Sequence, residues 1–541
     1  MRDAQDNGDS FDFIIVGGGT AGCVLANRLS ADPDNRVLLI EAGPRPRSPW
    51  IGLPAGFYKL LTNPRFNWRF HATPEPATCN REIAIPRGKG LGGSTLINGM
   101  IYVRGQRQDY DSWAQMGCTG WGFDDVEPVF RRLENYAGPD PDGLRGHDGP
   151  LDICEVQERP AIGEAFLNAA ETSGHARVTD YNGAAQDGVG YYQVNQRNGR
   201  RASAHAAYLA PVEHRRNLSV RTGLRVTGVE VTDGRARAVR ATRAGETLRL
   251  TARREVILCA GSIQTPQLLE LSGIGDPARL QALGITPVQA LSGVGENYSD
   301  HFCTRLNWRV RQPLTLNEFT RGPRLLREVL RYGFARRGVL TYGTGLAHGF
   351  IRTRAGLVGP DVQFFFMHAS YANAAERKLE RAPGMTLGVT QLRPESRGSI
   401  HARTPRIEDQ PDIRPNFLAT EEDRRTMVAG MIEGRRIMEQ APMDDWRAHE
   451  MSPGPDCTTQ AEWLDFARRN GQTIYHAAGT CRMGQGPDAV VDPALRVRGI
   501  EGLRVVDASV MPSQVSGNSQ AAVFMIAEKG ADLILQADKA P

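Results

Sequence analysis

The sequence predicts an α/β (α+β) fold, and three observations point to this class. A short apolar strand, a glycine turn and a helix follow one another near the N-terminus. Apolar and polar residues alternate over residues 218–260, which predicts further strands. The 541 residues are 40% hydrophobic and 23% charged, a balance typical of globular proteins that excludes a disordered chain, a collagen and a coiled coil. We therefore expect two interwoven domains.

The N-terminal segment predicts a β-turn-α-β unit. Residues 11–16 and 37–40 are continuous apolar runs of strand length, and residues 20–30 have an apolar face at helical spacing. Three glycines in the spacing G-x-G-x-x-G form the first turn, and Glu41 closes the second strand. A glycine triplet is a weak signal alone, but strand, helix and acid in register predict a Rossmann-like dinucleotide site.

Each residue type in this unit has a chemical reason. Gly17 permits the tight turn, Gly19 lets a pyrophosphate approach the backbone, and Gly22 lets the helix pack closely on the strand. The first turn of the helix offers unpaired N–H groups to phosphates. Glu41 can accept hydrogen bonds from ribose hydroxyls, and its negative charge disfavours a 2′-phosphate. NADP is therefore disfavoured, while FAD and NAD both remain open.

The remaining elements follow from periodicity and from glycine and proline content. They are, in order, a second glycine cluster at 84–105, a helix at 123–136, a loop at 138–150, a strand at 362–367, a helix at 420–440 and a helix at 521–535.

Residues 324–337 predict an amphipathic helix with arginines between its apolar positions. Such a helix either lies on a membrane surface or covers a domain with its apolar face. We expect the second arrangement, with the polar face in solvent.

Charge and cysteine content exclude several classes of protein. The 65 basic and 61 acidic residues leave a formal net charge of +4, which gives no case for nucleic-acid binding. The eight cysteines form no C-x-x-C pair and no zinc-type cluster with histidine, so we expect no metal and buried free thiols in a reducing compartment. The first ten residues lack an apolar stretch, and no apolar run reaches 18 residues. The expected location is the cytoplasm, with peripheral contact at the inner membrane face as an open possibility.

Four further segments resemble one known family. Residues 87–100 read RGKGLGGSTLINGM, residues 261–275 read GSIQTPQLLELSGIG, residues 475–484 read YHAAGTCRMG and residues 504–512 read RVVDASVMP. With the glycine turn, these make five motifs in the order found in the glucose–methanol–choline (GMC) oxidoreductases. The resemblance extends over about residues 11 to 536 and is nearest to the choline dehydrogenase-like alcohol dehydrogenases and oxidases.

The resemblance implies one FAD, held between a discontinuous FAD-binding domain and a substrate-binding domain with an antiparallel sheet and helices. The expected FAD-binding domain is 1–155, 215–310 and 480–541, and the substrate-binding domain is 156–214 and 311–479. The residues implied to hold FAD are Gly17, Gly19, Thr20, Ala21, Gly22, Glu41, Ala42, Arg87, Gly92, Gly93, Asn98, Gly99, Met100, Val226, Ala260, Asp507, Ala508 and Asn518.

The same resemblance implies a catalytic pair. His476 takes the place of the family's catalytic base, and a neutral imidazole is suited to accept a hydroxyl proton near neutral pH. Asn518 takes the place of its partner and can orient the substrate oxygen without acting as a base. The implied reaction is oxidation of a primary alcohol to the aldehyde, with hydride transfer to flavin N5.

Departures from the family pattern bear on cofactor and substrate. Ile97 stands where some members tether FAD through histidine, so FAD is expected to be non-covalent. Leu346 stands near the place of the carboxylate that meets choline, which favours an apolar or aromatic alcohol over choline. Gln520 and Ala522 replace a more usual Asn and Pro. Tyr475, His368 and Leu346 are expected to line the substrate pocket.

Other functions on the same fold remain open. Some relatives are hydroxynitrile lyases and some are light-driven fatty-acid decarboxylases, and both contain FAD. A non-enzymatic flavoprotein is a third alternative, which the pair of His476 and Asn518 disfavours. For an oxidoreductase, the electron acceptor is oxygen or a quinone, and the sequence does not choose between them.

Overall fold

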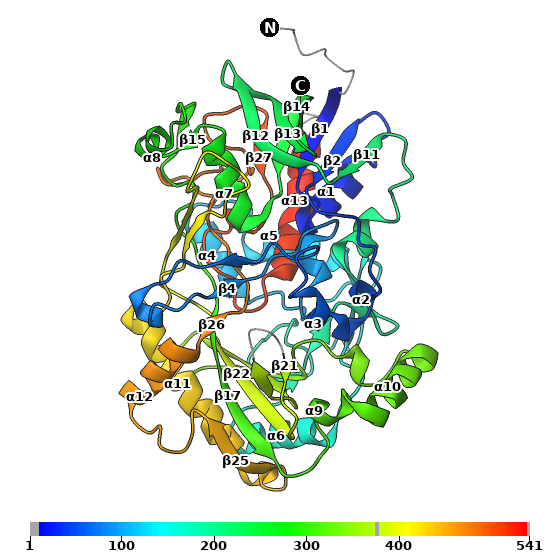
Figure 1. Cartoon of the computed structure of the whole chain (residues 1–541), viewed down its shortest axis with the longest axis vertical. Helices are drawn as coiled ribbons and strands as arrows, with labels where there is room; N and C mark the ends of the chain where they lie inside the picture. The colour runs from blue at the N-terminus through cyan, green and yellow to red at the C-terminus, as the bar shows by residue number, and fades with distance from the viewer. Residues whose placement is uncertain (1–9, 374–377, 538–541) are drawn as a thin grey trace.

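Two seven-stranded sheets organise the chain, one in each half of the elongated molecule (Figure 1). The computed structural model describes residues 10–373 and 378–537. The loose tail predicted for the first ten residues lies outside them, apart from Ser10, which begins β1.

The first sheet has the order β11-β2-β1-β14-β13-β12, and β27 pairs with the far end of β14. Strands β11, β2, β1, β14 and β27 are parallel to one another, whereas β13 pairs antiparallel with both β14 and β12. This confirms the α/β fold and the strands predicted over residues 218–260. The strands are β1 Ser10–Val16, β2 Val37–Glu41, β11 Leu218–Thr222, β12 Arg225–Thr232, β13 Arg235–Arg243, β14 Glu246–Leu258 and β27 Leu503–Val505.

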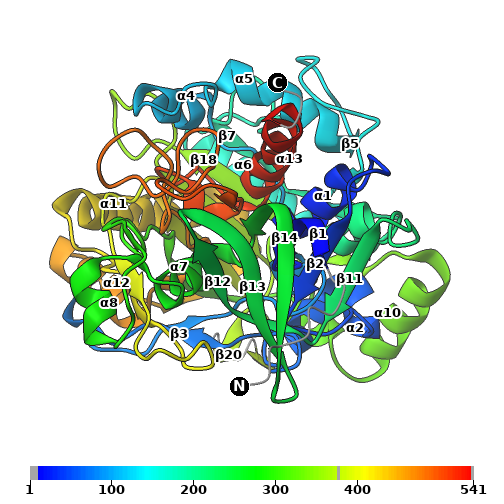
Figure 2. The ribbon, with the colours of Figure 1, turned by 90° about the horizontal axis from the view of Figure 1, so that it is seen from above.

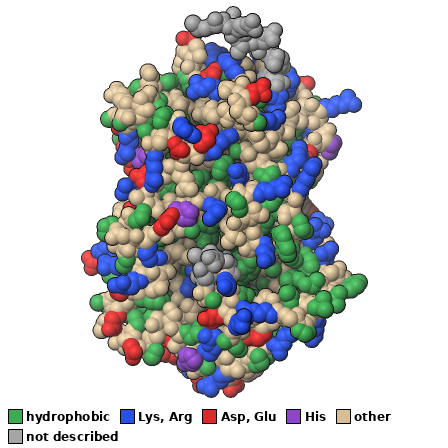
Figure 3. Space-filling view, in the orientation of Figure 1, with side chains coloured by type: hydrophobic (Ala, Val, Ile, Leu, Met, Phe, Trp, Pro, Cys, Tyr) green, Lys and Arg blue, Asp and Glu red, His purple; other side chains and the backbone are tan. Residues whose placement is uncertain are grey.

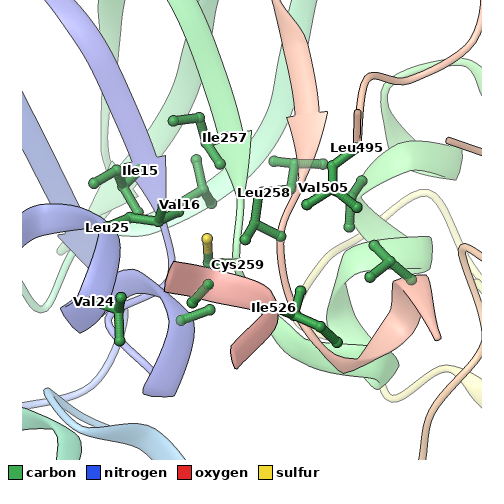
Figure 4. Packing of buried hydrophobic residues seen from close by; sticks show 14 of the residues in the cluster. Ile15, Val16, Val24, Leu25, Ile257, Leu258, Cys259, Leu495, Val505 and Ile526 are labelled. Carbon is green, nitrogen blue, oxygen red and sulfur yellow. The ribbon is translucent and has the colours of Figure 1, made fainter. Parts of the chain in front are cut away.

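Two helices from opposite ends of the chain cover one face of this sheet (Figure 2). They are α1 (Thr20–Leu29) and α13 (Gln520–Ala537). Figure 4 shows side chains of β1, β14, α1 and α13 meeting in one apolar core around Cys259. Gly22 is required there, because a Cβ on it would lie 1.9 Å from the Gly17 carbonyl oxygen.

The second sheet is antiparallel throughout and has the order β25-β17-β22-β19-β18-β7, with β26 on β17. Helices α6 (Ala161–Thr172) and α11 (Glu421–Met438) pack on its outer face, and the inner face looks toward the first sheet. This confirms the predicted sheet-plus-helix character of the second half. The strands are β7 Gly188–Tyr191, β17 Phe302–Val310, β18 Ala347–Ile351, β19 Val362–Met367, β22 Gly384–Gln391, β25 Arg447–Ser452 and β26 Gln472–Thr473.

Shorter elements connect the two sheets. The other helices are α2 Pro49–Gly52, α3 Phe57–Leu60, α4 Arg107–Gln115, α5 Phe123–Leu133, α7 Gly261–Leu271, α8 Pro277–Ala282, α9 Leu316–Phe319, α10 Gly322–Ala335 and α12 Gln460–Asn470. The other strands are β3 Phe70–His71, β4 Ala84–Ile85, β5 Glu134–Ala137, β6 Leu151–Glu155, β8 Gln193–Val194, β9 Gln196–Arg197, β10 Arg200–Arg201, β15 Ile274–Gly275, β16 Gln289–Ala290, β20 Tyr371–Asn373, β21 Lys378–Leu379, β23 Ser399–His401 and β24 Asp412–Arg414.

Two sequence-based boundaries differ from the structure. The helix predicted at 123–136 ends at Leu133, because Glu134 turns inward to bind Arg104 and Arg145 and begins β5. The domain limit at residue 310 assigns β17 to the first domain, yet β17 pairs only with strands of the second sheet. We propose that this limit lies before Phe302. The other parts of the domain division remain a prediction.

Helix α10 contradicts the arrangement expected for residues 324–337. The helix forms as predicted, but its apolar side chains are exposed rather than packed on a domain. Its buried residues are Glu328 and Tyr332.

All eight cysteines are free, as predicted, although Cys79 is exposed and Cys154 and Cys457 are only half-buried. Across residues 10–373 and 378–537, no helix is long and apolar enough to cross a membrane.

Candidate active site

One cavity lies between the two sheets, at the carboxyl ends of β1, β2 and β14. Ligands of open α/β sheets bind at this edge. The inner face of the second sheet closes the opposite side through β17, β19 and β22. The cavity is lined by most of the residues expected from the sequence, namely Gly17, Gly19, Thr20, Ala21, Glu41, Ala42, Arg87, Gly93, Asn98, Gly99, Met100, Val226, Ala260, Tyr475, His476, Asp507, Ala508 and Asn518.

Four expected residues do not line it. Gly22 and Gly92 lie behind the wall, where Gly92 donates its N–H to the Gly18 carbonyl. Leu346 is fully buried in the second core, and its N–H bonds to Phe366. The His368 ring is buried against Tyr342. The structure therefore gives Leu346 and His368 no contact with the cavity.

Glu41 joins three glycine-rich loops at the nucleotide end of the cavity. Its Oε2 accepts the N–H of Gly18 at 2.8 Å, and its Oε1 accepts those of Gly43 at 2.7 Å and Gly90 at 3.0 Å. Burial raises the pKa of this carboxyl, while the three N–H groups act in the opposite direction. Glu41 is thus a structural anchor of the loops as well as a cavity residue.

The loops leave open space where a flat, charged ligand needs backbone contact. A Cβ on Gly19 would meet nothing nearer than 4.0 Å and would project into the cavity, beside the N-terminus of α1. Gly261, at φ +83°, is equally open. Asp507 anchors this side, since its Oδ2 accepts from Gly261 N–H and the Thr265 hydroxyl. This cradle fits a dinucleotide pyrophosphate.

Asn98 is half-buried in the cavity wall and belongs to a cluster of polar side chains. Its Oδ1 accepts from the guanidinium of Arg201 at 2.6 Å, and its amide donates to Gln520. The Gln520 amide in turn donates to Asn195 at 3.0 Å. The side chain at position 520 therefore has two hydrogen-bond partners, and it lines the cavity.

The backbone of His476 is held from both sides. Its N–H donates to buried Asp300 at 2.8 Å, and its carbonyl accepts from Gln514 at 2.7 Å. The preceding Tyr475 has φ +75°, a left-handed conformation that is uncommon for an aromatic residue. The Arg87 guanidinium donates to the Tyr475 carbonyl at 2.8 Å and helps to hold this turn.

Hydrogen bonds determine which nitrogen of His476 is protonated. His301 Nε2 lies 2.9 Å from the Leu392 carbonyl, which can only accept, so this nitrogen bears the proton of a neutral His301. His301 Nδ1 is then an acceptor, and it lies 2.9 Å from His476 Nδ1. The shared hydrogen therefore belongs to His476 Nδ1, and His476 Nε2 is unprotonated and able to accept.

The unprotonated Nε2 of His476 accepts a hydrogen bond from the Asn518 amide. The Asn518 amide nitrogen lies 3.2 Å from His476 Nε2, and the Asn518 Oδ1 accepts from Gln363 at 3.1 Å. Gln363 therefore orients Asn518 so that its N–H groups point to the cavity. Burial lowers the pKa of His301 to about 4 and holds that of His476 well below its usual 6.5, with a contribution from the neighbouring His301.

The wall formed by the second sheet consists mainly of apolar side chains, with a few polar ones. Its side chains include Cys303, Phe365, Met367 and Thr386, and Arg305 adds one guanidinium. Among the described lining residues the only carboxylates are Glu41 and Asp507, both at the nucleotide end. Strand alternation in residues 302–310 and 362–367 could have indicated these side chains. His301 had no such signal, because an isolated Asp-His pair before a strand is not specific.

Replacing Glu41 with Gln tests the anchoring role. The amide nitrogen can accept nothing, so at least one buried glycine N–H loses its partner, at a cost of about 1–3 kcal/mol. We expect a lower melting temperature and loss of bound cofactor on gel filtration. The matched control is Glu246→Gln on the exposed start of β14. An unchanged melting curve and cofactor content in Glu41→Gln would contradict the role.

Comparison with known proteins identifies the family of this chain. Two family models, both described as GMC oxidoreductase, match residues 11–303 and 394–527. The alcohol dehydrogenase (acceptor) of Pseudomonas putida is 40% identical over 530 residues, which are 97% of this chain and 96% of that protein. The oxygen-dependent choline dehydrogenase of Vibrio vulnificus (strain YJ016) is 38% identical and covers 98% of this chain and 95% of its own.

Solved structures show the same fold. Pyridoxine 4-oxidase from Mesorbium loti superposes with a TM-score of 0.88 at 32% identity, over 97% of this chain and 99% of that chain. Formate oxidase of Aspergillus oryzae RIB40, whose FAD is named in its title, superposes with a TM-score of 0.91 at 27% identity, over 98% and 99%. The chain belongs to the GMC oxidoreductases and is an FAD-dependent alcohol oxidoreductase.

Proposed function

We propose that this enzyme oxidises an apolar or aromatic primary alcohol to the aldehyde, with His476 as the base. The observation that supports this most directly is the unprotonated Nε2 of His476, a cavity-lining residue whose lone pair accepts a hydrogen bond from the Asn518 amide. Family membership establishes the reaction class, whereas the substrate and the roles of these two residues are our proposal.

We propose that FAD is held without a covalent bond, since Ile97 offers no nucleophile. Gly17, Gly19 and the first turn of α1 would hold the pyrophosphate, and Val226 and Glu41 would border the adenosine half. Gly93, Asn98, Asp507 and Ala508 would hold the pyrophosphate, ribityl and ring regions. When bound, FAD supplies the acceptor for the hydride that leaves the carbinol carbon.

The chain itself handles the proton and the substrate oxygen. When the alcohol binds, its hydroxyl would replace the Asn518 N–H on His476 Nε2, which accepts the hydroxyl proton, and the Asn518 amide would donate to the alcohol oxygen and fix its position. The imidazolium that results keeps its Nδ1–H bond to His301, which is neutral and can accept it. Gln363 holds Asn518, and His301 holds His476. An alcohol oxygen placed between Asn518 and His476 therefore reacts at a lower entropic cost.

The composition of the substrate wall supports an apolar alcohol. Phe365, Met367 and Cys303 lie on it, and no described carboxylate is present there to bind a quaternary ammonium group. Arg305 adds a positive charge, which disfavours a cationic substrate. Although several relatives are named choline dehydrogenase, we propose that choline is not the preferred substrate here.

For the second half-reaction we propose oxygen or a quinone as electron acceptor. Eight free cysteines are consistent with a reducing compartment, and we propose the cytoplasm with peripheral contact at the inner membrane face.

Anaerobic bleaching of the flavin band near about 450 nm tests the proposed function. We expect bleaching in the dark by benzyl alcohol or octanol and much less by choline, because the wall is apolar. Admission of air, or addition of a quinone, then identifies the acceptor. Bleaching by choline alone would contradict the substrate proposal. Flavin that no alcohol bleaches would instead favour a hydroxynitrile lyase or a photodecarboxylase.

His476→Ala tests the proposed base. Loss of a well-placed base costs about 10²–10⁴-fold in rate, so flavin reduction should slow by that factor while FAD content is retained. The exposed His449→Ala serves as the matched control and should reduce at the wild-type rate. If His476→Ala reduces its flavin as fast as the control, the assignment fails.

The pH dependence of flavin reduction tests the histidine pair. Because the pKa of His476 lies well below 6.5, the residue is already neutral at that pH and stays neutral as pH rises. Stopped-flow reduction rates should therefore be flat between about pH 6 and 8 and should fall only on further acidification. A half-maximal rate near pH 6.5 would show an unperturbed base and contradict the burial argument.

A further inference from the structure

Helix α10 (Gly322–Ala335) presents its apolar face to solvent. Leu326, Leu330 and Phe334 follow one another at four-residue spacing and are 62%, 52% and 90% exposed, and Val329 beside them is also exposed. Figure 3 shows hydrophobic side chains gathered at the right-hand edge of the molecule, where Figure 1 places α10. We call these four residues the α10 apolar face.

Polar contacts on the opposite side hold this orientation. Glu328 is buried, and its carboxylate accepts the N–H of Val339 at 3.0 Å. The Tyr332 hydroxyl donates to the Gly199 carbonyl at 3.0 Å. Turning the apolar face inward would break both bonds and leave the Val339 N–H and the Gly199 carbonyl without these partners, which is unfavourable. The helix is therefore built to keep leucine and phenylalanine outside.

The surroundings of the face are strongly basic. Residues 321–337 contain six arginines, all exposed, and Glu328, which is buried, is their one acidic residue. Some of these arginines have protein partners, such as Arg331 with Glu158. The surface nevertheless combines a row of large apolar side chains with an excess of positive charge, which is the pattern of helices that lie in an anionic bilayer surface.

The face lies beside the wall of the cavity. Helix α10 packs on the turn at Val339–Thr341, which packs on the turn at Pro54–Gly56. The next residue, Phe57, lines the cavity. Trp50 on α2 is 44% exposed, and α2 and α10 lie on the same side of the molecule in both ribbon views (Figures 1 and 2).

We propose that α10 docks the enzyme on an anionic lipid bilayer, with the α10 apolar face among the acyl chains and the arginines at the phosphates. A second copy of the chain fits this surface less well, because symmetric pairing would place six arginines against six. Docking by α10 places the Phe57 side of the cavity next to the phase in which an apolar alcohol accumulates. Helix α10 would thus be the element that makes the peripheral membrane contact of the proposed function. The docking proposal does not depend on which alcohol the enzyme oxidises.

Co-sedimentation of the full-length holoenzyme with vesicles tests the proposal. The vesicles are phosphatidylcholine alone or phosphatidylcholine with phosphatidylglycerol. We expect binding to the anionic vesicles that weakens as salt is raised. Phe334→Glu should reduce the bound fraction by about tenfold or more, since it places a carboxylate in the apolar layer. Arg327→Glu should weaken binding to the anionic vesicles alone.

Val358→Glu is the matched control. Val358 is 81% exposed in the loop between β18 and β19, so this change adds the same charge at a site outside α10. The control should bind vesicles as the wild type does. FAD content and bleaching by a water-soluble alcohol should be unchanged in all variants, which separates docking from catalysis.

Absence of vesicle binding at low salt overturns the proposal, as does equal binding of Phe334→Glu and Val358→Glu. Self-association in analytical ultracentrifugation that Phe334→Glu abolishes, without vesicle binding, would assign the face to a second copy and overturn it as well.

Discussion

Close approach of bare backbone is the constraint on which the nucleotide half of this molecule depends. Three loops converge behind the first turn of α1, and the Glu41 carboxylate bonds to one N–H from each. Side chains have no room there, since a Cβ on Gly43 would lie 2.3 Å from the Gly90 nitrogen. One buried acid thus replaces the side-chain packing that would otherwise hold the loops together.

At the end of the cavity that contains His476, the proposed chemistry depends on uncharged imidazole rings. His301 and His476 share a hydrogen bond in a buried setting, and burial disfavours a charge on either ring. The Leu392 carbonyl decides the direction of that bond, because it can only accept. The protonation of the base is thereby determined by a backbone oxygen two hydrogen bonds away, while the Asp300 carboxylate holds the backbone of His476 and not its ring.

On the surface of the second half, helix α10 buries polar side chains and exposes apolar ones. A charged and a phenolic side chain point inward from α10 and leave its apolar residues in solvent. Burial of a few polar contacts therefore shapes both the active site and the exposed helix. In each case the polar group is satisfied by a backbone atom, which is available only once the chain has folded.

Local sequence was sufficient for the strands of the first sheet up to residue 260, for β19 and for the glycine turn, and the family motifs were sufficient for the cavity position of His476 and Asn518. These depend on periodicity and on short motifs, whose residues are neighbours along the chain. It was not sufficient for the end of α5, for the place of Leu346 and His368 behind the wall, or for the outward face of α10. Each of these depends on contacts between residues far apart in sequence. The partnership of His301 with His476 joins residues 175 positions apart, and it exists because β17 and the segment after β26 are brought side by side. Residue type and spacing therefore determined the family motifs and the expected chemistry. Long-range packing decided which nitrogen of His476 is protonated, which face of α10 is exposed and which side chains line the cavity, because these depend on contacts that form only in the folded chain.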